Sequence, residues 1–598
     1  MQPVKRMNIH IKKFFDWRAK YISDKNFMYI LSLIVGLLSG LTAVVLKNAV
    51  HFVEYLLKNG ISHVHDYLYF IYPAVGIMLV ILIAKFIIRD KVGHGIPIML
   101  YAISKGNGNI GKKDTWASVI TASITVGFGG SVGLEGPTVA TAGAISSNLG
   151  QLLRLDYKKK KLLIGAAASG ALAAIFNAPI AAIVFALEVI MLDLTVTSLI
   201  PLLLASASAT VMSRMIMNDD FLFHFSVIDT FTVSKTMFYV VLGLFTGLLS
   251  INFTNTYFFT AKWLKKIDNV YLKPVIGGVT VGAMIFIFPQ LYGEGYATIN
   301  ALVANDLELA LAPFSMYENI SENMILASLL LFALPVLKSL AASLTLNSGG
   351  VGGIFAPTLF IGSTGGYMFG YILSYLGFEN ISRSNFTLVG MAGAMAGILQ
   401  APLTAIFLIA EITGGYTLFL PLMITAVISF VFTKYFTPYS VYTRQLGEEG
   451  DLITHHKDKA VLTLMRLQNE IEKNFLTVHA EDKLGDLVKI VSRSSRNLFP
   501  VIDDTNTFLG VVNLNDVREI MFDRDKYEEL HVHELMTAAP EFIYTSDNMD
   551  KVMRKFDQSG AWNLPVVTED SKYIGFVSKS KLFSAYRKLL RDFYEEED

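Results

Sequence analysis

Long apolar segments separated by short polar ones fill the chain up to about Gly447. Most of the long segments approach or reach the ~20 residues with which a helix crosses a ~30 Å hydrocarbon core. After Gly447 the chain becomes charged, and apolar residues alternate with polar ones. The pattern predicts an all-α membrane domain that crosses the bilayer many times, followed by a soluble domain. The long apolar segments include Phe27–Leu46, Tyr67–Ile88, Met237–Phe253, Met324–Leu344 and Phe419–Phe432.

Charge and composition place the domain boundaries. Residues 1–25 are basic and amphipathic, and no cleavable signal peptide is evident before the first apolar segment. Positive charge beside a first span predicts a cytoplasmic N-terminus, and the basic run Tyr157–Lys161 reads as a cytoplasmic loop by the same rule. We therefore predict a cytoplasmic segment at 1–25, a membrane domain at 26–446, a linker at 447–474 and a soluble domain at 475–590.

The membrane domain contains an internal duplication. The sequence GGSVGLEGPT matches GGVGGIFAPT, which aligns Pro137 with Pro357. A second pair, GALAAIFNAPIAAIVFALE and GAMAGILQAPLTAIFLIAE, aligns Pro179 with Pro402. Because the two motif pairs have nearly equal offsets, they indicate repeat halves at about 26–215 and 235–446. Duplicated membrane halves often have inverted topology and bind their substrate at the midplane through broken helices, which also agrees with two cytoplasmic termini.

The soluble part repeats as well. LFPVIDDTNTFLGVVNLNDVREIM and NLPVVTEDSKYIGFVSKSKLFSAY align with Pro500 on Pro565, and each reads as strand, turn, strand and helix. The two units, at about 475–528 and 534–590, resemble a pair of α/β CBS modules, which often bind adenine nucleotides. Asp516 is the acidic residue suited to a ribose, but Lys581 stands at the matching place in the second unit. Adenine nucleotide binding is therefore a secondary expectation, and no cofactor is required.

Composition narrows the function classes. With 53% hydrophobic residues, 17% charged residues and a mean hydropathy of +0.48, the chain is too apolar for an ordinary soluble protein. The absence of cysteine excludes disulfides, thiolate metal sites and cysteine nucleophiles. Balanced formal charge argues against a nucleic-acid partner.

Three glycine-rich stretches interrupt apolar segments and end in proline: GHGIP at 93–97, GLEGP at 133–137 and GGIFAP at 352–357. Such breaks expose backbone N–H groups that lipid cannot satisfy, and a helix N-terminus favours an anion. Glu135 lies in the second stretch, although a carboxylate at bilayer depth costs roughly 2.5–3.5 kcal/mol. The three stretches together predict an anion path in which Glu135 has a function.

These stretches, with FNAPIAAIVFALE and the CBS-like tail, make nearly the whole chain resemble the CLC family of chloride channels and chloride/proton exchangers. The resemblance implies a homodimer in the lipid bilayer, with one pore in each subunit. Glu135 matches the gating glutamate, which occupies an anion site until it is protonated or displaced. A tyrosine near the end of the membrane domain, Tyr439 or Tyr442, would also contact the anion, with Tyr439 nearer the family's position. The remaining anion-binding positions by this match are Gly93, His94, Gly95, Leu134, Gly136, Ile354 and Phe355.

Three substitutions depart from the family pattern. His94 replaces a serine, a change that can accompany an altered anion preference. Its imidazole would donate to the anion and make occupancy depend on pH, or it would only fill space while the backbone of Gly93 and Gly95 binds the anion. Leu134 replaces an arginine and removes a cation beside the gate. Val189 replaces the internal glutamate that accepts protons in exchangers, as is typical of the channels.

The predicted function is channel-like chloride transport gated by Glu135, with chloride/proton antiport as the alternative and a CBS-bearing magnesium transporter as a remote one. An enzyme is not expected. GNGNIGKK at 106–113 almost matches a nucleotide-binding P-loop, but Lys113 replaces the required hydroxyl residue, and no metal-binding HExxH motif occurs. The protein is expected in a bacterial inner or plasma membrane, with chloride or another small anion as substrate and no resident metal.

Overall fold

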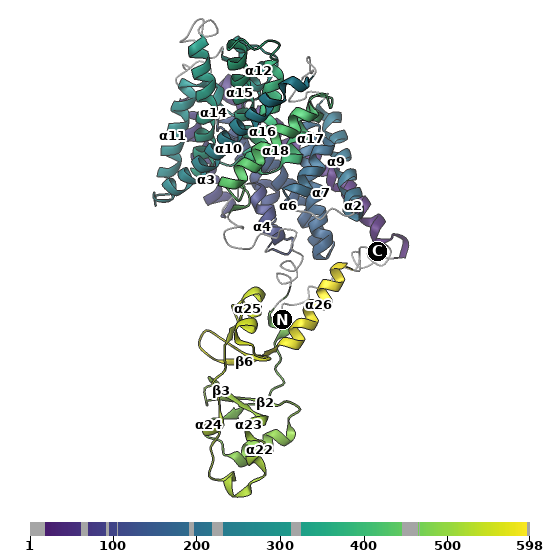
Figure 1. Cartoon of the computed structure of the whole chain (residues 1–598), viewed down its shortest axis with the longest axis vertical. Coiled ribbons are helices and arrows are strands. Elements are labelled where there is room, and N and C mark those ends of the chain that lie inside the picture. The colour runs from purple at the N-terminus through teal and green to yellow at the C-terminus, as the bar shows by residue number, and fades with distance from the viewer. Residues whose placement is uncertain are drawn as a thin grey trace. The chain divides into compact units, whose positions relative to one another are not determined.

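The computed structural model describes residues 18, 20–60, 70–90, 95–104, 106–190, 196–217, 231–311, 324–444, 465 and 467–594. The chain divides into two compact units, Met1–Leu452 and Ile453–Asp598 (Figure 1). Of the predicted linker, residues 447–464 lie outside the described part of the chain. The first unit is helical, and the second contains two small sheets.

The first half of the membrane unit consists of helices that begin and end at glycine, proline or short polar turns. Among them, α2 and α9 are long and apolar enough to cross a membrane. The helices are α2 (Asp24–Gly60), α3 (Tyr72–Ile83) with its π-helical continuation η2 (Ala84–Ile88), α4 (Ile96–Ser104), α5 (Asp114–Gly127), α6 (Glu135–Leu152), α7 (Tyr157–Phe176), α8 (Pro179–Glu188) and α9 (Val196–Met217).

The second half repeats this order. Three of its helices, α10, α14 and α18, are long and apolar enough to cross a membrane. The helices are α10 (Thr236–Lys265), α11 (Leu272–Ile287), α12 (Tyr296–Val303), α13 (Leu307–Leu311), α14 (Met324–Asn347), α15 (Phe355–Tyr375), α16 (Arg383–Leu399), α17 (Pro402–Ile412) and α18 (Phe419–Phe436), and the short 3-10 turns η3 (Val233–Lys235) and η4 (Pro289–Leu291) precede α10 and α12.

The two halves pack their helices in the same way. In the first half α6 packs on α7, α7 on α9 and α9 on α2; in the second, α15 packs on α16, α16 on α18 and α18 on α10. The five described helices long enough to cross a membrane are only partly covered by neighbours, and large apolar side chains such as Phe86, Leu248 and Val431 are exposed. An apolar outer surface on a helical body with a buried core is what a lipid environment requires. The duplication predicted from the motif pairs is therefore a structural one.

Helices α8 and α17 both begin with proline and are joined by hydrogen bonds at their ends. Glu188, the last residue of α8, accepts hydrogen bonds from the first N–H groups of α17 at 3.1 Å and 2.8 Å. Glu411, near the end of α17, accepts hydrogen bonds from the first N–H groups of α8 at 3.0 Å and 2.7 Å. Because the end of each helix lies at the start of the other, these equivalent helices run in opposite directions, as inverted repeats require.

The second unit consists of two copies of one β-α-β-β-α arrangement. In each copy the first strand pairs in parallel with the second and the second pairs antiparallel with the third, with a bulge at the same place. The copies are β1 (Val478–His479), α22 (Leu484–Arg493), β2 (Leu498–Ile502), β3 (Phe508–Asn513) and α23 (Leu514–Val517), and β4 (Ile543–Tyr544), α25 (Met549–Ser559), β5 (Asn563–Val567), β6 (Tyr573–Ser578) and α26 (Lys579–Tyr594). α21 (Leu467–Glu470) precedes the first copy, and the 3-10 turns η6 (Ile520–Phe522) and η7 (Arg524–Tyr527) and α24 (Val532–Leu535) connect the two.

Asp547 is expected to make the stability of the second copy depend on pH. Burial would raise the pKa of Asp547, but hydrogen bonds from Lys551, Lys555 and the Tyr544 N–H hold it below its ordinary value. A lowered pKa in the folded state gives stability that is present at neutral pH and is lost as the pH falls through that pKa. Asp547→Asn should therefore cost about 3 kcal/mol at neutral pH and remove the loss of stability below about pH 4.

Hydrogen–deuterium exchange of peptides from residues 543–594 in the full chain, corrected for intrinsic exchange rates, measures this effect. Asp550→Asn is the control, because Asp550 pairs with Arg554 on the solvent-facing side of α25. Equal protection in the Asp547 and Asp550 variants at neutral pH would show that the buried pair contributes nothing specific.

Candidate functional site

Two of the three predicted glycine-proline stretches meet at helix starts in the middle of the membrane unit. α6 begins at Glu135 and α15 begins at Phe355, each within its glycine-rich stretch. Gly133 and Gly353 join the stretches by two backbone hydrogen bonds, N–H to O at 2.9 Å and 2.7 Å. Neither helix has a cap from the side chain of its N-cap residue. The uncapped starts of two equivalent helices, one from each half, are therefore fixed side by side.

The third stretch contributes Gly95, just before α4. Its φ is +61°, which favours glycine, and a Cβ here would lie 3.0 Å from the Gly136 backbone. A Cβ on Gly353 would lie 2.8 Å from the Gly136 nitrogen. The close approach of three backbone segments thus requires these three glycines. Gly93 and His94 lie outside the described residues.

Glu135 lies at this junction, buried with 1% of its surface exposed. Its Oε1 accepts a hydrogen bond from the hydroxyl of Tyr296, and the backbone N–H of Ala356 in the other half's helix faces the carboxylate. Among the described residues its Oε2 has no hydrogen-bond partner, and it lies so close to Gly133 that a Cβ there would be 2.0 Å away. The carboxylate of Glu135 therefore occupies the space between the two helix starts.

Three polar residues that the sequence motifs did not predict complete the site. Tyr296 begins α12, Glu294 lies two residues before it, and Lys338 comes from α14. Lys338 is fully buried, and its Nζ donates to the backbone oxygen of Gly293 at 2.7 Å and lies within electrostatic reach of Glu135 and Glu294. Position 134 carries no cation in this chain, but Lys338 brings one to the site from α14. A lone lysine in the apolar segment 324–344 was a signal for such a function.

The N–H groups predicted to bind the anion are not equivalent. The N–H of Leu134 donates to Glu294 Oε1 at 3.1 Å, so that an internal carboxylate already occupies it. Ile354 is the N-cap residue of α15, and Phe355 packs its ring against Phe176 and Phe185 with centroids 5.1 Å and 6.3 Å away. The start of α15 is therefore enclosed by aromatic rings on one side and faces the carboxylate of Glu135 on the other.

The two candidate tyrosines differ in burial. Tyr439 is exposed, at 37%, whereas Tyr442 is 7% exposed and within electrostatic reach of Glu135. Its hydroxyl has no hydrogen-bond partner among the described residues, although it is buried. The geometry favours Tyr442, whereas the sequence register favoured Tyr439, because the turn after α18 at 437–444 directs only the later tyrosine inward.

Val189 directly follows α8 as its C-cap residue and is buried, and its backbone N–H donates to the backbone oxygen of Phe185. The neighbouring acid, Glu188, is held by the start of α17 as described above and by the hydroxyl of Thr404 at 2.8 Å. The described residues around position 189 therefore place no free carboxylate where the exchangers of the family have one.

In the second unit, Asp516 is exposed on α23, and Lys581 directs its Nζ to backbone oxygens of α21 at 3.3 Å and 3.4 Å. The two positions are thus chemically unlike. A nucleotide that used an acid in both copies would find it only in the first.

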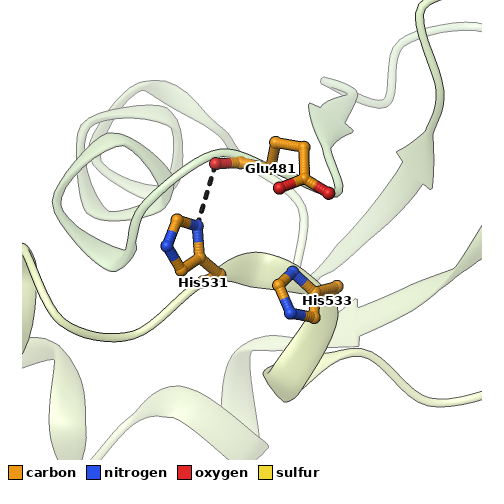
Figure 2. A group of neighbouring side chains, drawn as sticks. All are labelled: Glu481, His531 and His533. Atoms are coloured by element: carbon orange, nitrogen blue, oxygen red, sulfur yellow. Dashed lines mark hydrogen bonds between the residues drawn. The ribbon is translucent and has the colours of Figure 1, made fainter.

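One group in the described part of the chain brings three potential metal ligands within 4.8 Å of one another: Glu481, His531 and His533 (Figure 2). Each histidine ring faces a backbone oxygen with its Nδ1, His531 that of Glu481 at 3.1 Å and His533 that of Ala480 at 3.2 Å. The two rings stack on each other, and their contacts with the backbone at 480–481 join that segment to the start of α24. These contacts account for the placement of the two histidines.

The duplicated helical unit, its paired helix starts and the C-terminal sheet modules define a membrane transport protein with a C-terminal α/β unit. Residues 75–434 match the family model of the voltage gated chloride channel, and residues 469–523 and 532–588 match that of the CBS domain. The chain belongs to the voltage-gated chloride channel family, CLC, and carries a C-terminal pair of CBS domains. This match replaces the magnesium-transporter alternative and confirms the predicted fold class.

Known relatives cover most of the chain. The H(+)/Cl(-) exchange transporter ClcA of Vibrio cholerae is 28% identical over 449 residues, which are 70% of this chain and 88% of that protein. The crystal structure of a slow cyanobacterial Cl-/H+ antiporter has a TM-score of 0.60 at 22% identity and covers 71% of this chain and 97% of its own. That of a eukaryotic CLC transporter has a TM-score of 0.57 at 19% identity and covers 93% and 97%. The two structures share the fold with this chain.

Proposed function

We propose that this protein transports chloride through the junction of the α6 and α15 helix starts and that Glu135 is its gate. The observation that carries the proposal is the buried carboxylate of Glu135 between two uncapped helix N-termini from opposite halves. Helix N-termini carry partial positive charge and free N–H groups, so that a carboxylate and a chloride ion compete for the same place. Glu135 is thus an anion that belongs to the protein and can leave the site.

Two events would free the site for chloride. Protonation removes the negative charge that holds the Glu135 carboxylate at the helix starts. A high chloride concentration displaces the carboxylate by competition. In both cases Tyr296 keeps a hydrogen-bond partner within reach, because a hydroxyl can donate or accept. The proposed anion site also includes backbone at Gly95, Gly136, Ile354 and Phe355, with Gly93 and His94 as further members.

We infer that conduction is passive, because Val189 replaces the internal proton acceptor. Proton exchange is the second candidate, and the relatives named as exchangers favour it. A proton that reaches Glu135 has no acid at position 189 to receive it. Passive transport therefore requires that chloride flux proceed without a matching proton flux.

Purified protein in liposomes tests both candidates. An outward chloride gradient with the potential clamped by valinomycin and potassium should give chloride efflux measured with a silver–silver chloride electrode, and no uphill proton movement measured with a pH electrode. Stoichiometric proton pumping would overturn the passive mechanism and support exchange. Absence of any chloride flux, with a ClcA exchanger active in parallel liposomes, would overturn the proposed function.

Tyr442→Phe is expected to weaken chloride binding, and Tyr439→Phe is expected to leave it unchanged. The first substitution removes a buried hydroxyl that would donate to the anion, worth about 1.5 kcal/mol or roughly a tenfold change in Kd. The second removes an exposed hydroxyl. Isothermal titration of chloride into detergent-solubilised protein measures the Kd of both variants. A larger effect in Tyr439→Phe than in Tyr442→Phe would favour Tyr439, as the sequence register does.

We also infer a homodimer with both termini in the cytoplasm of a bacterial cell, from the family resemblance and the basic N-terminal segment. Cross-linking in native membranes and protease protection of the two termini in oriented vesicles test these two inferences separately.

A further inference from the structure

Glu294 is an acidic residue at the ion site to which neither the sequence motifs nor the proposed mechanism gives a function. It lies in the turn between η4 and α12, flanked by Gly293 and Gly295. Its Oε1 accepts the Leu134 N–H at 3.1 Å, directly before the gate in the chain. Glu294 therefore contacts the helix start that bears Glu135, although the two acids belong to opposite halves of the duplication.

The charged groups that act most strongly on Glu294 come from three elements of the described part of the chain. Lys338 on α14 is the cation that interacts with both acids, and its Nζ is fixed by the backbone oxygens of Leu291 and Gly293 at 3.4 Å and 2.7 Å. Glu135 on α6 and Glu54 on α2 are the other acids within electrostatic reach. Among titratable hydroxyls, Tyr296 faces both Glu135 and Glu294, and Tyr442 faces Glu135.

Lys338 is held by the same turn that carries Glu294. Its side chain is fully buried, and the two carbonyl oxygens that it contacts flank Tyr292 and precede Glu294. A buried ammonium group requires a nearby negative charge or strong acceptors. With Glu135 in place the site has two acids to one lysine, and with Glu135 protonated or displaced it has one of each.

We propose that Glu294 is a counter-charge that accepts a hydrogen bond from the Leu134 N–H and, in its ionised form, offsets Lys338, and thereby sets how strongly the site holds chloride and the Glu135 carboxylate. The proposal rests on the proposed function, because it concerns the same site. Glu294 acts through the groups that touch the anion and is a positioning residue. It keeps the positive potential low enough for an anion to leave, as conduction requires.

Removing the charge of Glu294 has a definite sign. Lys338 would then face the site unopposed, so that chloride and the ionised form of Glu135 would both be held more tightly. More acid would be needed to protonate Glu135, and the midpoint of pH-activated transport would move to lower pH. Removing the charge of Lys338 would move the same midpoint to higher pH.

The test uses the full chain in liposomes and measures chloride efflux against pH for wild type, Glu294→Gln, Glu294→Asp and Lys338→Gln. Glu294→Gln keeps the acceptor oxygen for the Leu134 N–H and should lower the midpoint by about one pH unit, because a unit charge close by in a poorly screened site interacts by more than about 1.4 kcal/mol. Lys338→Gln should raise it by a similar amount. Glu294→Asp, which keeps the charge, should change it by less than half as much as Glu294→Gln.

The control is Glu308→Gln, because Glu308 is an exposed acid on α13 in the same half. Its midpoint should equal that of wild type. Isothermal titration of chloride at a pH below the midpoint, where protonated Glu135 no longer competes, provides a second readout, with about tenfold tighter binding expected in Glu294→Gln.

Opposite shifts in Glu294→Gln and Lys338→Gln support the proposal, since loss of structure would not move a midpoint in both directions. An unshifted midpoint and an unchanged chloride Kd in Glu294→Gln overturn it while leaving the proposed function intact, provided that wild type conducts chloride. If Glu294→Gln does not fold, the Lys338→Gln midpoint decides, and a shift to lower pH or no shift overturns the proposal. Wild-type protein that carries no chloride overturns the proposed function itself.

Discussion

Glu135→Gln is expected to abolish the pH dependence of chloride transport and leave a pore that conducts at every pH. The amide has nearly the shape of the carboxylate but no charge, so that the two helix starts no longer hold it in place of an anion. Wild-type flux should change by up to about tenfold per pH unit around its midpoint, as a single protonation allows. In a His94→Ser background, which removes the other group expected to titrate in this range, flux through the variant should vary by less than about twofold from pH 4.5 to pH 7.5.

Tyr296→Phe provides the matched control. It removes the hydrogen bond to Glu135 Oε1 and keeps the charge of the carboxylate. Loss of one hydrogen bond to a charged group, about 1.5 kcal/mol, should raise the flux at neutral pH roughly tenfold while the pH dependence remains. Unaltered pH dependence in Glu135→Gln would remove Glu135 from the gate, and the same flat profile in Tyr296→Phe would show that packing rather than charge is measured. Efflux assays in liposomes at a series of pH values provide the data.

The second large effect is expected at the junction of α8 and α17. Glu188→Ala should destabilise the protein by about 3 kcal/mol, because it removes the acceptor of two backbone N–H groups and of the Thr404 hydroxyl at the start of α17. Glu411→Ala removes the acceptor of the two equivalent N–H groups at the start of α8. Since the two caps are related by the repeat, the two substitutions should cost amounts that agree within about 1 kcal/mol.

Unfolding of the purified protein in a mild detergent, followed by circular dichroism, measures both variants. Glu188→Gln and Glu411→Gln are the controls, because an amide oxygen still accepts one of the two N–H groups and should lose about half as much stability. A cost below about 0.5 kcal/mol in either alanine variant would mean that water satisfies these helix ends and that the caps are incidental.

The sequence predicted the features that repeat and the features that interrupt a pattern. Two pairs of prolines at nearly equal offsets located the halves, and a single acid among glycines located the buried carboxylate between the two helix starts. The copies in the tail were equally visible, because strands and turns recurred with Pro500 aligned on Pro565. These signals are local, and each can be recognised within one short motif and its copy.

The parts of the site that the sequence did not predict depend on contacts between distant segments. Glu294 reaches Leu134 from a glycine-flanked turn with no motif of its own, and Lys338 reaches both acids from within an apolar helix. Tyr439 and Tyr442 lie within one short turn, and only the path of that turn decides which is buried. The arginine absent at Leu134 suggested a site without a cation, because sequence alone could not show that another helix supplies one.

The hydrogen bonds between Gly133 and Gly353 bear on how access to the two sides of the membrane is switched. Many transporters built from inverted repeats alternate their access by rocking one half against the other. Here the halves are bonded backbone to backbone at the proposed ion path, so that such rocking would break both bonds at the place where the ion would pass. The joined helix starts are instead suited to stay in place while the side chain of Glu135 moves. Side-chain motions are orders of magnitude faster than domain rotations. Turnover would then be limited by how often Glu135 leaves its place rather than by a rearrangement of the fold.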